Sequence, residues 1–218
     1  LKQYNLSNNQ IIGFPEEDDY NQNILSKSSF ERDYHTKVKT FPQIVMYNKC
    51  VETYIGGYVE LEELLRPRYN FKKLYDVTKV VTRNLDNVID INFYPVKETE
   101  LSNKRHRPLG IGVQGLADVY CKMRYPFDSK EASQLNKEIF ATIYYASLQM
   151  SHELAIEKGP YSTFENSPLS QGKMQFDLWN TSPIVDVGID SQCSLKLEWD
   201  SLRQEIIKHG VRNSLLLA

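Results

Sequence analysis

The sequence has no apolar run as long as the roughly 18 residues that a membrane span needs. No signal peptide opens it, and a net charge of −2 argues against a general affinity for nucleic acid, which favours basic chains. Its 3 cysteines are unevenly spaced and fit neither a disulfide framework nor a zinc site. We therefore expect a reduced, soluble, cytoplasmic protein that binds no membrane, no nucleic acid and no metal.

The rest of the composition is that of an ordinary globular chain, with 218 residues, of which 41% are hydrophobic and 25% charged. This length allows one sizeable core and an appendage. Residues 1–45 differ from the rest, because asparagine, glutamine and acidic residues surround isolated apolar pairs such as Ile11–Ile12. We interpret residues 1–45 as an irregular or partly disordered segment of unknown role, and residues 46–218 as the folded domain.

The most informative stretch is Leu101–Cys121. A cationic run, Lys104–Arg107, is closed by Pro108, and Leu109–Val113 then alternates large apolar residues with glycine. This pattern predicts a strand of a parallel sheet, with Leu109, Ile111 and Val113 buried. Gly110 and Gly112 would allow another backbone or a ligand to approach closely. A helical period follows Gly115, so the stretch is half of a βαβ unit.

Helical periodicity marks three further segments. One begins after Asn70 as its N-cap and ends near Asp90, before a loop at 97–104. The second is capped by Asp128 or Ser129, spans roughly 28 residues, or about 42 Å at ~1.5 Å per residue, and ends at Gly159–Pro160. The third lies between Leu197 and His209, and Val211–Ala218 reads as a second strand, while Phe41–Val51 predicts a shorter one.

The stretch Leu101–Cys121 resembles the signature LSN-x-RHRP-x-GIGVQGLAD of the large, catalytic subunit of class I ribonucleotide reductase. The resemblance covers roughly Tyr69–Ala218. Six other segments carry it: TRNLDNVIDINFYPV (Thr82–Val96), RYPFDS (Arg124–Ser129), NKEIFATIYYASL (Asn136–Leu148), GPYSTFENSPLSQG (Gly159–Gly172), QFDLWN (Gln175–Asn180) and HGVRNSLLLA (His209–Ala218).

The resemblance implies an α/β fold in which residues 46–218 form a helix-rich part of a ten-stranded α/β barrel. It implies the radical-based reduction of ribonucleoside diphosphates to deoxyribonucleoside diphosphates for DNA synthesis. It also implies ATP and dNTP effectors, a dithiol reductant, a homodimer of large subunits, and a small subunit whose di-iron centre supplies the radical. We expect this segment itself to bind no cofactor. The alternative is a truncated, non-catalytic relative that acts only as an assembly or regulatory partner.

The family places a redox cysteine and a basic glutamate on an Asn–x–Cys–x–Glu strand, and Asn48, Cys50 and Glu52 fit that pattern. A thiol beside a carboxylate suits the chemistry, because the carboxylate can take the proton of the ribose 3′-hydroxyl. The alternative is that these residues are the variable end of another strand. The resemblance places the family's phosphate-binding loop after Ala218 and its radical-carrying cysteine outside this sequence. We therefore expect this chain alone to be inactive.

The remaining chemically active residues have structural interpretations. Cys121 is predicted to be a buried thiol packed like a small hydrophobe. The run Lys104–Arg107 either binds phosphate, serves as an import-like basic run, or pairs with carboxylates, and the resemblance favours pairing, for which arginine is well suited. His152 and His209 lack the ligand spacing of a metal site, and His209 suits the negative end of a helix dipole.

Overall fold

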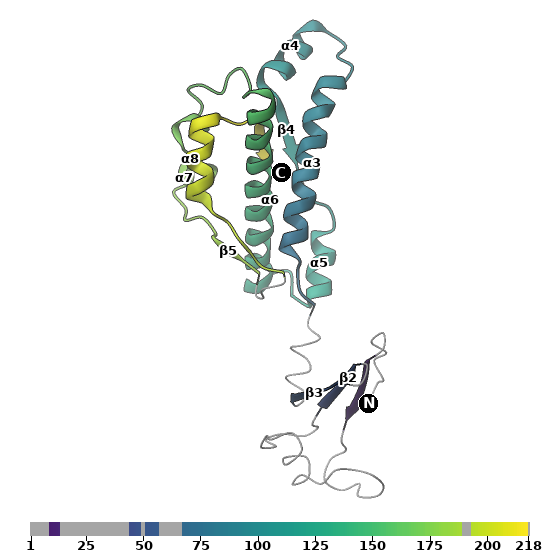
Figure 1. Ribbon diagram of the computed structural model, residues 1–218. Helices are drawn as coiled ribbons and strands as arrows, with labels where there is room; N and C mark the ends of the chain where they lie inside the picture. Colours follow the sequence, from purple (N-terminus) through teal and green to yellow (C-terminus); the bar gives the residue numbers. More distant parts are fainter. Residues whose placement is uncertain (1–8, 14–43, 49–50, 57–66, 189–192, 218) are drawn as a thin grey trace, which may run out of the picture. The chain divides into compact units, whose positions relative to one another are not determined.

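The computed structural model describes residues 9–13, 44–48, 51–56, 67–188 and 193–217. The chain divides into two compact units, Leu1–Pro67 and Arg68–Ala218 (Figure 1). No helix in the described ranges is both long enough and apolar enough to cross a membrane.

The first unit holds a three-stranded antiparallel sheet in the order β1-β2-β3. Its strands are β1 (Asn9–Gly13), β2 (Ile44–Asn48) and β3 (Val51–Gly56). The strand expected within Phe41–Val51 is present as β2. Strand β1 contains Ile11 and Ile12, so these 5 residues are paired rather than irregular. Their partner strand lies more than thirty residues further along the chain, and local periodicity carries no sign of it.

Two long helices, α3 (Phe71–Ile91) and α6 (Lys130–Lys158), lie side by side in the second unit (Figure 1). Both confirm the helices predicted from periodicity. The Asn70 side chain caps α3 by accepting a hydrogen bond from the Lys73 N–H at 2.8 Å. Of the two cap candidates for α6, Ser129 is the cap, and its Oγ accepts from the Ala132 N–H at 3.1 Å. Gly159 ends α6 at a positive φ of 84°, which glycine adopts without strain.

The predicted parallel strands are β4 (Pro108–Ile111) and β7 (Ser214–Leu217), which pair with each other from Pro108↔Ser214 to Ile111↔Leu217. Leu109 and Ile111 are buried, as predicted. The prediction for Val113 was wrong, because this side chain is 37% exposed. The strand ends at Ile111, and Val113 lies in the turn that leads through Gly115 into α5 (Leu116–Met123).

The loop predicted at residues 97–104 is instead a helix, α4 (Lys97–His106). The prediction failed because α4 buries none of its residues and therefore has no apolar stripe. Charge stabilises it: Glu98 and Glu100 lie in the first turn and the basic residues in the last, which suits the helix dipole. Glu100 and Lys104 also form an ion pair one turn apart.

The remaining chain covers α6 on the side away from α3 (Figure 1). It contains the 3-10 helix η1 (Leu169–Gln171), α7 (Gln175–Leu178), the antiparallel pair β5 (Asp186–Val187) and β6 (Leu195–Lys196), and α8 (Trp199–His209). The predicted last helix is confirmed as α8. Its Trp199 packs against Tyr145 and Phe176, with ring centroids 5.1 Å and 5.0 Å apart. The fold is a helix-rich α/β arrangement consistent with part of a barrel, and the described strands are too few to form a ten-stranded one.

Replacing Ile139 or Ile143 by alanine should lower the free energy of unfolding by about 2–5 kcal/mol, because both lie in the core and leave a cavity when truncated. The matched control is Ile156→Ala on the same helix, where the side chain is 61% exposed. Denaturant unfolding of the three variants measures the difference. Core variants with the same unfolding midpoint as the control would show that this face of α6 has been misassigned.

Candidate functional site at the two ends of the parallel strands

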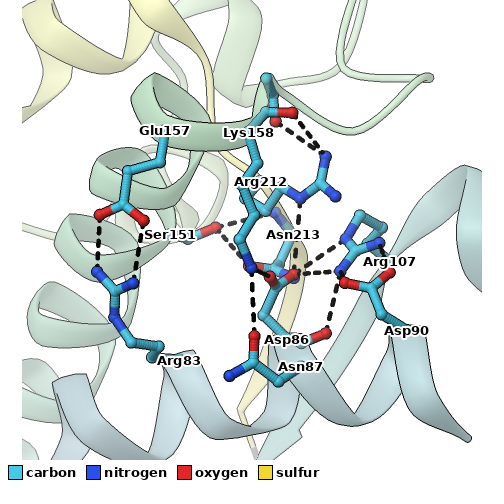
Figure 2. A network of polar contacts seen from close by, with 11 residues as sticks. Arg83, Asp86, Asn87, Asp90, Arg107, Ser151, Glu157, Lys158, Arg212 and Asn213 are labelled. Atoms are coloured by element: carbon cyan, nitrogen blue, oxygen red, sulfur yellow. Dashed lines mark hydrogen bonds and ion pairs between the residues drawn. The ribbon is translucent and has the colours of Figure 1, made fainter.

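A buried ion pair lies where the two parallel strands begin (Figure 2). Asp86 on α3 is fully buried, and Arg107, the residue before β4, is 3% exposed. Arg107 Nη2 and Nε lie 2.6 Å and 3.0 Å from Asp86 Oδ1. The same guanidinium donates to both oxygens of Asp90, at 2.8 Å and 2.9 Å. Nη2 donates a further hydrogen bond to the Asp86 backbone carbonyl, so all these hydrogen bonds of the Arg107 side chain go to α3.

This arrangement confirms the carboxylate-pairing interpretation of the basic run for Arg107. Burial opposes the charge of Arg107, but the hydrogen bonds that Arg107 donates to Asp90 and Asp86 outweigh it and raise the pKa of Arg107. Those bonds also lower the pKa of Asp90. Arg107 adopts a left-handed conformation, with φ of 43°, which is uncommon for a residue with a side chain. The other members of the run lie on the surface, where Lys104 pairs with Glu100 and His106 Nδ1 lies 2.8 Å from Thr163 Oγ1.

Three more side chains approach the Asp86 carboxylate. Lys158 at the end of α6 places Nζ 3.2 Å from Oδ2, and Asn213, just before β7, donates from Nδ2 to Oδ1 at 2.8 Å. Arg212 Nε lies 3.7 Å from Oδ1 and, within the described residues, is buried without a hydrogen-bond partner. Burial and the nearby Arg107 lower the pKa of Arg212. Five groups from α3, α6 and the two strand starts thus meet at one point.

The sequence analysis did not identify Asp86, Asp90 or Asn213. A signal for Asp86 was present, because it falls on the same helical stripe as the buried residues Phe71, Thr82 and Ile89. A carboxylate on a buried stripe requires a cationic partner, since an unpaired charge in the interior is too costly to retain. The local sequence does not indicate which residues pair with Asp86, because Arg107 and Asn213 lie 21 and 127 residues away.

The opposite, carboxyl ends of β4 and β7 are the better place for a ligand, because open parallel sheets bind ligands at that edge. Pro108 and Gly110 are exposed while Leu109 and Ile111 are buried, so one face of β4 is covered and the other is open. A Cβ added at Gly110 would meet nothing within 4 Å. The exposed turn Gly112–Gly115 follows at the carboxyl end. This edge fits the expectation that Gly110 and Gly112 permit close approach.

The candidate catalytic residues Asn48, Cys50 and Glu52 belong to the first unit. Asn48 ends β2 and pairs with Val51 of β3, while Glu52 pairs with Tyr47. Asn48 and Glu52 therefore lie on adjacent antiparallel strands, whereas the resemblance implies a single strand. Cys50 lies outside the described residues. Their catalytic roles stay predictions.

The prediction of a buried Cys121 was wrong, because its side chain is exposed on α5. The buried side of that short helix is formed by Tyr120 and Met123, and Cys121 is turned away from it. Cys193 is half-buried, and its carbonyl accepts a hydrogen bond from the Phe71 N–H at 3.2 Å. His152 and His209 both approach Glu205, at 3.9 Å and 3.8 Å. Across the described ranges, no three acidic, histidine or cysteine side chains are placed to hold a metal ion.

Comparison with known proteins identifies the family. A family model described as "Ribonucleotide reductase, barrel domain" matches residues 24–218. This chain belongs to the ribonucleotide reductase barrel family. The match begins well before Tyr69, where the sequence motifs start, and it includes the segment that carries Asn48, Cys50 and Glu52.

Individual relatives agree with the family match. The ribonucleoside-diphosphate reductase large subunit of Plasmodium falciparum is 53% identical over 179 residues, which are 82% of this chain and 21% of the relative. The large subunit of Caenorhabditis elegans is 56% identical over 151 residues, 69% of this chain and 18% of the relative. Large chain 2 of Saccharomyces cerevisiae is 53% identical over 150 residues, 69% and 16% respectively. The predicted resemblance is confirmed, and the chain spans about a fifth of these relatives.

Removing the buried cation should be far more damaging than removing an exposed one. Arg107→Ala leaves Asp86 without its main partner, and we expect a loss of about 3–5 kcal/mol in the free energy of unfolding. Arg83→Ala is the matched control, because Arg83 also makes a bidentate pair with a carboxylate, that of Glu157, but this pair is exposed. Denaturant unfolding compares them, and equal losses would contradict the assignment of Arg107 as the central cation.

The lowered pKa of Asp90 gives a pH dependence with a definite sign. A carboxylate whose pKa is lower in the folded state contributes stability that is complete above its unfolded pKa and is lost as the pH falls through the folded one. Asp90→Asn should therefore be less stable than the parent at pH 7, and the difference should close below about pH 4. Asp128→Asn is the control, because Asp128 is exposed and forms no ion pair with the described residues. The free energy of unfolding is measured against pH for each protein. A difference between Asp90→Asn and the parent that stays constant from pH 7 to below pH 4 would refute the coupling to Arg107.

Proposed function

We propose that this chain is part of the catalytic barrel of a class I ribonucleoside-diphosphate reductase large subunit, acting in the cytoplasm. The observation that carries the proposal is the identity of 56% over 151 residues with a large subunit of that activity. The proposed reaction converts ribonucleoside diphosphates to deoxyribonucleoside diphosphates. Its proposed partners are a second large subunit and a small subunit whose di-iron centre generates the radical, with ATP and dNTPs as effectors.

The strand arrangement supports a substrate site at the carboxyl edge. The pairing Ile111↔Leu217 ends β4 and β7 at the same level. In the family that this chain resembles, the loop that binds the substrate phosphates follows the position of Ala218. Such a loop would continue from the end of β7, beside the turn Gly112–Gly115, which is exposed and has glycine at both ends. We infer that the open face of β4 is directed at the substrate.

The chemistry needs two electrons, which a dithiol supplies as it becomes a disulfide. We propose Cys50 as one thiol of that pair and Glu52 as the carboxylate that takes the 3′-hydroxyl proton, with Asn48 beside them. The support is the Asn–x–Cys–x–Glu pattern and its inclusion in the family match. No observation favours the alternative of a non-catalytic assembly partner.

The test uses the complete large subunit that contains this segment, with a competent small subunit, a ribonucleoside diphosphate, ATP and dithiothreitol. We expect deoxyribonucleoside diphosphate, lost in Cys50→Ala because one thiol of the reducing pair is missing. Cys121→Ala is the matched control and should keep its activity, since Cys121 is exposed on α5. Full activity in Cys50→Ala would remove the redox role of Cys50, and an inactive parent protein would remove the proposed function.

The isolated 218-residue chain gives a second check under the same conditions. We expect no measurable product, because loss of substrate positioning alone removes about 7–11 kcal/mol of catalysis. Product that depends on Cys50 would show instead that the segment contains a working site.

A further inference from the structure

The residues that immediately precede the two parallel strands both donate hydrogen bonds to the same oxygen atom. Arg107 precedes Pro108 of β4, and Asn213 precedes Ser214 of β7. Asp86 Oδ1 accepts from Arg107 Nη2 at 2.6 Å and from Asn213 Nδ2 at 2.8 Å (Figure 2). One carboxylate on α3 therefore bridges the starts of both strands.

The hydrogen bonds leave Asn213 a single orientation. A carboxylate only accepts hydrogen bonds, so the amide NH₂ of Asn213 must face Asp86 and its carbonyl oxygen must face the other way. That oxygen accepts from Ser151 Oγ at 3.0 Å, and the same Oγ accepts from the Asn213 backbone N–H at 2.9 Å. All three side chains are fully buried. The start of β7 is thus fixed to α3 through Asp86 and to α6 through Ser151.

The strands need such an anchor because their own pairing specifies register weakly. Each has 4 residues, β4 contains Gly110, and one face of β4 is open. The buried face of β4 opposes a slip of one residue, because that slip would turn Leu109 and Ile111 outward, but it does not oppose a slip of two. A slip of two residues preserves which side chains face inward but moves one strand end by about 6.6 Å, at ~3.3 Å per residue.

We propose that Asp86 is a positioning residue for the substrate: by holding Arg107 and Asn213 on one oxygen, it sets the relative height of the carboxyl ends of β4 and β7. This inference rests on the proposed function, which places the diphosphate at those ends. Asp86 touches neither substrate nor reacting atoms. It acts through the two strands that it aligns, each four residues long from the anchor to the site.

The carboxylate of Asp86 and the amide of Asn213 can be exchanged by substitution while the fold is retained. In Asp86→Asn, Arg107 keeps its two bonds to Asp90, so the guanidinium is not left without a carboxylate. Asn213→Asp instead places two carboxylates in contact, which disfavours the ionised state of one of them. The double variant Asp86→Asn with Asn213→Asp exchanges the two groups and restores one amide–carboxylate pair. Glu157→Gln is the matched control, because it removes a charge between α3 and α6 without touching either strand.

The variants are tested in the complete large subunit assembled with its small subunit. The informative quantity is KM for the ribonucleoside diphosphate, because KM does not depend on how much of a variant is correctly folded. We expect KM to rise about tenfold in each single variant, because a tenfold change corresponds to the loss of one hydrogen bond to a charged group. In the double variant KM should recover partly. Glu157→Gln should keep the parent KM.

Hydrogen exchange provides a readout that does not need activity. In Asp86→Asn the backbone amides of β4 and β7 should exchange about tenfold faster than in Glu157→Gln, with α8 unchanged, because local opening of the strand pair becomes easier. Single variants whose KM stays within about twofold of the parent overturn the proposal, even if their stability falls. If the parent protein makes no product, the proposed function fails separately. Unchanged exchange in β4 and β7 would then overturn the anchoring role as well.

Discussion

A single buried carboxylate determines how the second unit is assembled. An isolated charge in the interior is strongly unfavourable, so Asp86 is retained only because cationic and amide donors surround it. The donors come from the residue before β4, the end of α6 and the residue before β7. Each must be in place for the carboxylate to be satisfied. Arg107 adopts a left-handed backbone conformation, which is unfavourable for a residue with a side chain, while making these contacts.

The two ends of the strand pair have different characters for the same reason. At the amino ends, Asp86 and Arg107 are buried and paired with each other, which suits anchoring. At the carboxyl ends, the turn Gly112–Gly115 is exposed, and a Cβ added at Gly110 would meet nothing within 4 Å. Anchoring at one edge and exposed backbone at the other suit the substrate site proposed at the carboxyl ends.

Helix α3 exposes five large apolar side chains. On α3, Val77, Val80, Val81, Val88 and Ile91 are exposed, and the open face of β4 adds to the uncovered area. Parallel strands normally have both faces covered, and a two-stranded sheet has little stability of its own. These features agree with membership in a barrel family in which the matched relatives are about five times longer than the aligned segment.

The sequence by itself determined the helices that carry an apolar stripe and a cap, as at Asn70, Ser129 and Gly159, because these signals act over a few residues. It also determined the family, through ordered motifs around Gly110 and Gly112. It missed α4, which has no buried face, and it placed Cys121 and Val113 inside although each lies one or two residues from the buried positions. Only the tertiary structure decided that Asp86 would join Arg107 to Asn213. A hydrogen bond between a carboxylate and an amide across 127 residues of chain leaves no periodic trace, since its partners are determined by how helices and strands pack and not by their spacing.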